Sequence, residues 1–244
     1  MAHPGMSDPT PFADEDLLAA GLIHELRQPL TGAKAALALL SRELGAQATA
    51  LEAFELLGGQ VRRLEEILET FGGLLARPEA RGVPFALEPV VRRTLDLLAF
   101  RLRPLGPRYA FAPAPELPLA RGSPRAVVHA LSNLVGNALD ALEGSPAGRL
   151  EVRLLGPLAP GAPIELRVSD GGPGIPADLA PRIFEPGVTS KTGGRGSGLG
   201  LPLARRLMRG SGGEVVLVPP GEARRRSWAA AELAVTVPTA GEAP

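Results

Sequence analysis

The sequence predicts an α+β protein in which an antiparallel helical hairpin precedes an α/β sandwich. In two long segments before residue 78, apolar residues recur at steps of three and four, which is typical of amphipathic helices. Residues 77–84 then carry two prolines and a glycine between periodic segments. Beyond them, helical patterns alternate with short strand-like runs. We therefore predict a helical domain over 12–78, a linker over 79–84 and a second domain over 85–238.

The hairpin is predicted from two apolar seams. The first helix starts near Asp14 and carries Leu22, Leu26, Leu30, Ala33, Leu37, Leu40 and Leu44. After a break at 45–47, the second helix carries Leu51, Phe54, Val61, Leu64, Leu68, Phe71 and Leu75. Because the break is short, the helices should run antiparallel. One hairpin cannot cover both seams, so we expect a two-fold homodimer that forms a four-helix bundle.

The second domain is predicted to contain both helices and strands. In chain order we expect helices over about 88–103 and 124–142, strands near 150–155 and 164–168, a glycine-rich stretch, a helix after residue 200, and strands over 214–218 and 229–237. The strands are mostly neighbours in sequence, which favours an α/β sandwich over a doubly wound sheet.

Composition excludes several classes of function. The 26 lysines and arginines balance 26 aspartates and glutamates, so no net basic field favours nucleic acid. Cysteine is absent, which excludes disulfides, thiolate zinc sites and cysteine nucleophiles. No apolar run approaches the roughly 18 residues of a membrane span, and the start lacks the features of a signal peptide. We expect a soluble, cytoplasmic protein.

A histidine on the first helix is a candidate reactive group. His24 lies two residues past the seam position Leu22, about 200° around the helix, so it should project away from the bundle core. Periodicity alone favours an ordinary exposed histidine. However, Glu25 follows directly, and the amide of Gln28 lies one turn later on the same face.

Two polar groups in the second domain are candidates for ligand binding. Asn133 and Asn137 lie four residues apart on an otherwise apolar helix, where a buried amide needs a partner. The partner is either a polar ligand or another helix. Asp170 follows a strand and precedes Gly172 and Gly174, which permit close backbone approach, although such a sequence is also common in simple turns.

A glycine-rich loop precedes the helix expected after residue 200. It carries two cations, Lys191 and Arg195, and it ends in a glycine-rich helix entry. Backbone N–H groups at a helix N-terminus with nearby cations can hold phosphate. An unstructured surface loop is the alternative, and the run matches neither the P-loop nor the dinucleotide fingerprint.

In this order, the runs resemble the sequence boxes of the sensor histidine kinases. The matching runs are 24–30 for the H box, 133–137 for the N box, 170–174 for the first glycine box, 183–186 for the F box and 196–201 for the second glycine box. The resemblance covers roughly residues 17–238. It implies a dimerising, phosphoaccepting hairpin followed by the ATP-binding sandwich shared with gyrase, mismatch-repair ATPases and heat-shock chaperones.

The resemblance implies a role for each residue of the H and N boxes. Neutral His24 would attack the γ-phosphate of ATP, and Glu25 would accept its proton. Asn137 would supply an oxygen ligand to Mg²⁺. Asn133 stands where the related ATPases carry a glutamate that activates water, and an amide cannot take that proton. Gln28 would either orient a water against an aspartyl phosphate or serve only as a polar residue before Pro29.

In the remaining boxes, the resemblance implies nucleotide contacts. Asp170 would accept a hydrogen bond from the adenine amino group while Gly172 and Gly174 admit the ring. Lys191 and Arg195 would contact the γ-phosphate. The glycines of the second glycine box that would bind the nucleotide are Gly196, Gly198 and Gly200.

The implied partner is the receiver domain of a response regulator, whose aspartate would take the phosphoryl group. The alternative is a dimeric regulatory module that docks the regulator but phosphorylates slowly. An ATPase of the chaperone or topoisomerase type is disfavoured by Asn133 and by the H box. No sensor is evident in the sequence, so the signal would come from a separate protein, or this chain is the catalytic part of a larger one.

Overall fold

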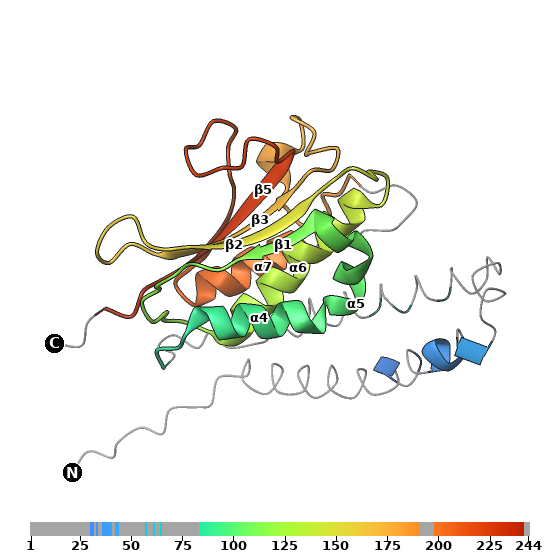
Figure 1. Cartoon of the computed structure of the whole chain (residues 1–244), viewed down its shortest axis with the longest axis horizontal. Coiled ribbons are helices and arrows are strands. Elements are labelled where there is room, and N and C mark those ends of the chain that lie inside the picture. Colours follow the sequence, from blue (N-terminus) through green and yellow to red (C-terminus); the bar gives the residue numbers. More distant parts are fainter. Residues whose placement is uncertain are drawn as a thin grey trace, which may run out of the picture. The chain divides into compact units, whose positions relative to one another are not determined.

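The structure is a computed structural model of the whole chain (Figure 1). It describes residues 30, 31, 33, 36–40, 42, 43, 57, 61, 64, 83–190 and 198–241. The chain divides into two compact units, one formed by 1–77 with 192–197 and the other by 78–191 with 198–244.

The described residues of the first unit are helical. Leu30 and Val61 are buried, and Leu37 packs against them. All three are seam positions of the two predicted helices, so residues from both segments meet in one small apolar cluster. The rest of the prediction for 12–78, including the boundaries of both helices and the turn between them, lies outside the described residues.

A mixed five-stranded sheet forms the centre of the second unit. Its strands are β1 (Tyr109–Ala112), β2 (Leu150–Leu155), β3 (Ile164–Asp170), β4 (Glu214–Leu217) and β5 (Ala231–Val237). Their order across the sheet is β1-β2-β3-β5-β4. β1 runs parallel to β2, and the other neighbouring pairs are antiparallel.

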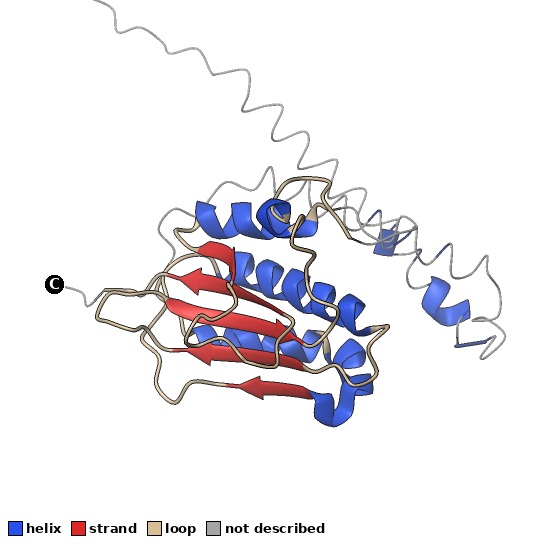
Figure 2. Cartoon of the chain, turned by 90° about the horizontal axis from the view of Figure 1, so that it is seen from above, coloured by secondary structure: helices blue, strands red, loops and turns tan. Residues whose placement is uncertain are grey.

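Helices cover one face of this sheet (Figure 1, Figure 2). The helical elements are α4 (Leu87–Leu97), α5 (Ala99–Leu102), the 3₁₀ segments η1 (Arg103–Arg108) and η2 (Ala180–Arg182), α6 (Pro124–Leu142) and α7 (Gly200–Gly210). Alternate strand residues, among them Val152 and Leu166, are fully buried in a core with Leu131 and Val135 of α6. The predicted two-layer α/β sandwich is confirmed.

The long helix α6 begins and ends where the sequence predicts. Ser123 caps it, since its Oγ accepts a hydrogen bond of 3.3 Å from the N–H of Ala126. Pro124 occupies the first helical position, where its missing N–H costs no intrahelical bond. The apolar stripe of this helix faces the sheet, which leaves the polar positions of the same helix for other contacts.

Other elements differ from the prediction. The helix predicted over 88–103 is divided, because α4 ends at Leu97 and the chain continues as α5 and η1. Gly106 interrupts η1 with φ 53° and ψ −125°, a backbone conformation that favours glycine. The short strand β1 was not predicted. β3 extends two residues further than predicted, through Asp170, and β5 begins at Ala231 rather than at residue 229.

Within the described parts of the chain, we find no helix that is both long and apolar enough to span a bilayer.

Candidate functional site

The polar face of α6 is the base of the candidate site. Asn133 and Asn137 are both half-buried, and Nδ2 of Asn137 donates a hydrogen bond of 3.1 Å to Oδ1 of Asn133. The two amides therefore form a pair one helical turn apart. In this pair Asn137 is the donor, and its carbonyl oxygen is of the kind that binds hard cations.

A buried carboxylate lies at the end of β3. Asp170 is 7% exposed, and its Oδ1 accepts a hydrogen bond of 3.0 Å from the N–H of Gly172. Burial raises the pKa of Asp170 to about 6, against the opposing effect of that hydrogen bond. A carboxylate in such surroundings is a strong acceptor for a neutral donor such as an exocyclic amino group.

The first glycine run, residues 170–174, lies against the C-terminal part of α6. A Cβ at Gly172 would be 3.0 Å from the Cβ and the backbone oxygen of Ala141, so a side chain would displace this turn from the helix. Gly174 has φ 80°, a left-handed conformation that other residues rarely adopt. Gly172 therefore keeps the backbone beside Asp170 close to α6, and Gly174 supplies the left-handed turn that follows it.

The described part of the second glycine run, residues 198–201, contacts the same helix about two turns earlier, at Asn133 instead of Ala141. A Cβ at Gly200, the first residue of α7, would collide with Nδ2 of Asn133. Gly198 has φ 65°, and its C=O accepts a hydrogen bond of 3.0 Å from the N–H of Gly187. The start of α7 is therefore packed directly on the asparagine pair, as a phosphate-holding helix N-terminus would need to be.

The structure brings together seven of the predicted site residues and leaves six outside its description. Asn133, Asn137, Asp170, Gly172, Gly174, Gly198 and Gly200 lie on α6 or in the two glycine runs that contact it through Gly172 and Gly200. Outside the described residues lie His24, Glu25, Gln28, Lys191, Arg195 and Gly196. Their roles therefore remain predictions.

Sequence reasoning missed two charged residues beside the asparagine pair. Asp140 follows Asn137 by three residues on the same side of α6, and its Oδ1 accepts a hydrogen bond of 2.8 Å from Nη2 of Arg101. Helical spacing from Asn133 and Asn137 would have identified Asp140. Arg101 comes from α5, and no signal in the sequence links it to α6.

The predicted F box is anchored to α7. The guanidinium of Arg205 lies 4.4 Å from the ring centroid of Phe184, within the range of a cation–π contact. Nε of Arg205 also donates a hydrogen bond of 2.8 Å to Glu214. This aromatic residue therefore packs against the helix that carries the second glycine run.

Two family models match the chain. The model "His Kinase A (phospho-acceptor) domain" matches residues 14–72, and "Histidine kinase-, DNA gyrase B-, and HSP90-like ATPase" matches residues 122–237. The two matches fall within the two domains predicted from the sequence.

Individual relatives agree with the family models. The chain is 32% identical over 216 residues to the two-component sensor PprA of Pseudomonas aeruginosa, a match covering 84% of this chain and 23% of PprA. It is 30% identical over 209 residues to the sensory histidine kinase/phosphatase NtrB of Rhizobium leguminosarum, covering 80% of this chain and 53% of that protein. This chain therefore spans about half of the NtrB relative and less than a quarter of PprA.

A solved structure supports the fold. The crystal structure of full-length ShkA in complex with AMPPNP aligns with a TM-score of 0.61 and 26% identity, over 93% of this chain and 47% of that one.

Proposed function

This chain belongs to the sensor histidine kinases, and we propose that it phosphorylates its own His24 from Mg-ATP and passes the phosphoryl group to an aspartate of a response-regulator receiver domain. The observation that carries the proposal is the convergence of the asparagine pair and both glycine runs on one helix, α6. Because these described parts of the predicted nucleotide site lie together, the arrangement argues against an inactive nucleotide site.

The site fits the two ends of ATP. At one end, the Asp170 carboxylate would accept a hydrogen bond from the adenine amino group, with Gly172 and Gly174 leaving room for the ring. At the other end, the N-terminus of α7 lies against Asn133, where its N–H groups would meet the phosphates. Lys191 and Arg195 would add positive charge there.

The donor set also fits Mg²⁺. This ion prefers oxygen ligands and usually binds through one or two protein groups together with substrate phosphates. The Asn137 carbonyl oxygen is such a group. When bound, the ion would neutralise charge on the phosphates. Asp140 is held in an ion pair with Arg101, so we assign only Asn137 as a ligand.

The reaction is a phosphoryl transfer to nitrogen. A ring nitrogen of neutral His24 forms a bond to the γ-phosphorus, the bond from that phosphorus to the β,γ-bridging oxygen breaks, and ADP leaves. Glu25 accepts the imidazole proton. Asn133 lacks the basicity to activate water, so transfer to histidine is favoured over hydrolysis.

The helical unit supports a homodimer. Its described residues include large side chains that a single chain leaves about half exposed, namely Leu39 (53%), Leu40 (44%), Leu57 (51%) and Leu64 (51%). Leu40 and Leu64 are seam positions. A second hairpin would bury them in a four-helix bundle, at about 25 cal/mol for each Å² of apolar surface covered.

The proposal is tested by incubating the protein with γ-labelled ATP and Mg²⁺. We expect a protein-bound label that is labile in acid and stable in base, which is the behaviour of a phosphoramidate. EDTA should abolish the labelling. A protein that binds ADP but gains no label would instead be the slow regulatory module that docks a response regulator.

The raised pKa of Asp170 makes nucleotide affinity depend on pH. Above about pH 6 the carboxylate is ionised and accepts the adenine hydrogen bond, whereas below it the protonated acid is a poorer acceptor. We therefore expect ADP affinity to fall as the pH drops below about 6, by up to about tenfold for each pH unit. Calorimetric titrations across this range measure it. Asp170→Asn should bind more weakly with a flat profile, and an unchanged slope in that variant would assign the effect to another group.

Gln28 is proposed to serve a phosphatase activity, which the name of the NtrB relative records for that protein. Gln28 follows His24 by four residues, so on the predicted helix its carboxamide would lie one turn beyond the histidine, where it could orient a water against an aspartyl phosphate. We expect Gln28→Ala to keep autophosphorylation and to release phosphate from a phosphorylated receiver domain at least about tenfold more slowly. Dephosphorylation at the parent rate would show that Gln28 is only a polar residue before Pro29.

A further inference from the structure

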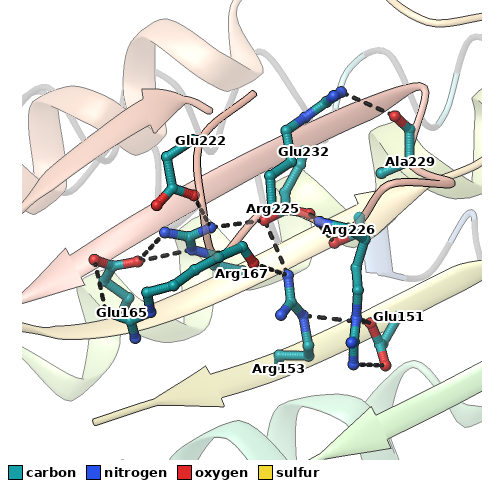
Figure 3. A network of polar contacts seen from close by, with 11 residues as sticks. Glu151, Arg153, Glu165, Arg167, Glu222, Arg225, Arg226, Ala229 and Glu232 are labelled. Carbon is teal, nitrogen blue, oxygen red and sulfur yellow. Dashed lines mark hydrogen bonds and ion pairs between the residues drawn. The ribbon is translucent and has the colours of Figure 1, made fainter. Parts of the chain in front are cut away.

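The sheet face opposite the helices carries a buried network of charges (Figure 3). At its centre is Glu232 of β5, which is fully buried. Its carboxylate accepts four hydrogen bonds, from Arg153 Nη2 (3.0 Å), Arg167 Nη1 (3.0 Å), Ser169 Oγ (2.7 Å) and the backbone N–H of Arg226 (3.0 Å). This carboxylate is therefore completely enclosed by donors.

Strand alternation places these side chains on the outer face. Arg153 of β2 and Arg167 of β3 alternate with leucines and valines that face the helices, and the two arginines are paired across the strands. Such positions usually contact water. Here residues 218–230, which we call the strap, cover them.

The strap is fixed by contacts with both sides of the network. Arg226 donates to Glu151 through Nε (2.6 Å) and Nη2 (2.8 Å), and Glu222 accepts from Arg167 at 2.7 Å. The C=O of Arg224 accepts from Arg153 at 3.1 Å. The strap thus closes over the sheet by pairing its own charges with those of the strands.

Glu232 is the residue on which this packing depends most. Without its negative charge, Arg153 and Arg167 would remain buried side by side and would lose the carboxylate that both contact. This loss is unfavourable even though Arg153 keeps Glu151, and Arg167 keeps Glu165 and Glu222. The backbone N–H of Arg226 would also lose the charge of its acceptor. The strap would then be held mainly by its more exposed contacts.

The C-terminal end of the strap contacts the backbone of the proposed nucleotide site. Ser169 pairs with Glu232, and in the next rung Asp170 pairs with Ala231. The last strap residue, Ala230, donates its N–H to the C=O of Asp170 at 2.8 Å. A Cβ at Gly174 would lie 3.4 Å from the oxygen of Ala230. The strap therefore borders the backbone of Asp170 and of the first glycine run.

We propose that Glu232 is a positioning residue for the adenine end of the nucleotide site, because it holds the strap that fixes the backbone around Asp170 and Gly174. Glu232 touches no substrate. It acts through the Ser169 pair and through the strap end at Ala230. The inference rests on the proposed nucleotide site.

The test is calorimetry with two probes, Mg-ADP and Mg-tripolyphosphate, on folded protein. Glu232→Gln should weaken ADP binding by about tenfold, the loss of roughly one hydrogen bond in the site. Tripolyphosphate lacks adenine, so its affinity should stay within about twofold of the parent value. A general loss of folding would instead weaken both probes in proportion.

Glu165→Gln is the matched control. Glu165 also pairs with buried Arg167, at 2.6 Å, and with Arg224 of the strap, at 3.5 Å, but it lies opposite Thr236, five residues along β3 from Asp170. We expect this variant to lower the midpoint of thermal unfolding and to keep the parent affinity for ADP. Equal losses of ADP affinity in Glu165→Gln and Glu232→Gln would contradict a specific role for Glu232.

Ser169→Ala keeps the inference testable if Glu232→Gln does not fold. It removes one neutral donor from Glu232 and leaves the ion pairs intact. ADP affinity should fall by about threefold. Parent affinity in Ser169→Ala, or in a folded Glu232→Gln protein, would overturn the inference. If the parent protein itself binds no ADP, the proposed function fails before this inference is reached.

Discussion

His24→Ala is expected to abolish phosphorylation of the protein while ADP and ATP still bind with the parent affinity. The proposed acceptor belongs to the helical unit, whereas the asparagine pair and Asp170 belong to the other unit. Loss of the nucleophile removes the P–N bond-forming step and leaves the nucleotide contacts untouched. Labelling with γ-labelled ATP and calorimetry with ADP measure the two properties separately.

His129→Gln is the control for His24→Ala. His129 lies four residues before Asn133 on α6 and is the histidine of the nucleotide-binding unit. It is therefore the rival acceptor by position. We expect the His129→Gln protein to take up label to the parent level. Label that persists in His24→Ala and disappears in His129→Gln would remove His24 from the mechanism.

Asn137→Ala and Asp170→Asn are expected to weaken nucleotide binding in different ways. Asp170→Asn should cost about 1 to 3 kcal/mol, or roughly 5- to 150-fold, for ATP and ADP alike, because both contain adenine. Asn137→Ala should remove the part of the affinity that depends on Mg²⁺, with a larger loss for ATP than for ADP. Calorimetry with both nucleotides, with and without Mg²⁺, separates the two effects.

Stability gives an independent check on Asp170→Asn. Because burial raises the pKa of Asp170 to about 6, ionisation lowers the free energy of unfolding as the pH rises from about 4 to about 6. The neutral amide avoids this cost, so the variant should be more stable than the parent at neutral pH although it binds nucleotide less well. Equal and negligible effects of Asn137→Ala and Asp170→Asn on nucleotide binding would mean that the nucleotide site is elsewhere.

The regular elements of the second unit could be predicted where local signals agree. α6 was predicted at its observed bounds because Ser123, Pro124 and an apolar stripe all indicate one helix. β1 was missed because its four residues, Tyr109–Ala112, are too few to show alternation. Its place at the sheet edge comes from pairing with β2, which is a tertiary contact.

The candidate site was predicted from motif order rather than from local pattern. Gly172 and Gly200 approach α6 at different points, and no spacing in the sequence states that both runs meet the same helix. The charge network was not predicted at all. Alternation places Arg153 and Glu232 on the solvent side of their strands, and only the strap, which is distant in sequence from β2, buries them.

Locating the phosphoryl group in the parent protein distinguishes His24 from every other acceptor. After reaction with Mg-ATP, the protein would be digested at neutral or mildly basic pH, where phosphohistidine survives, and the peptides sequenced by mass spectrometry. We predict a phosphoryl group on His24 alone among the three histidines. A phosphoryl group on His129 or on a serine or threonine, with His24 unmodified, would contradict the proposed mechanism.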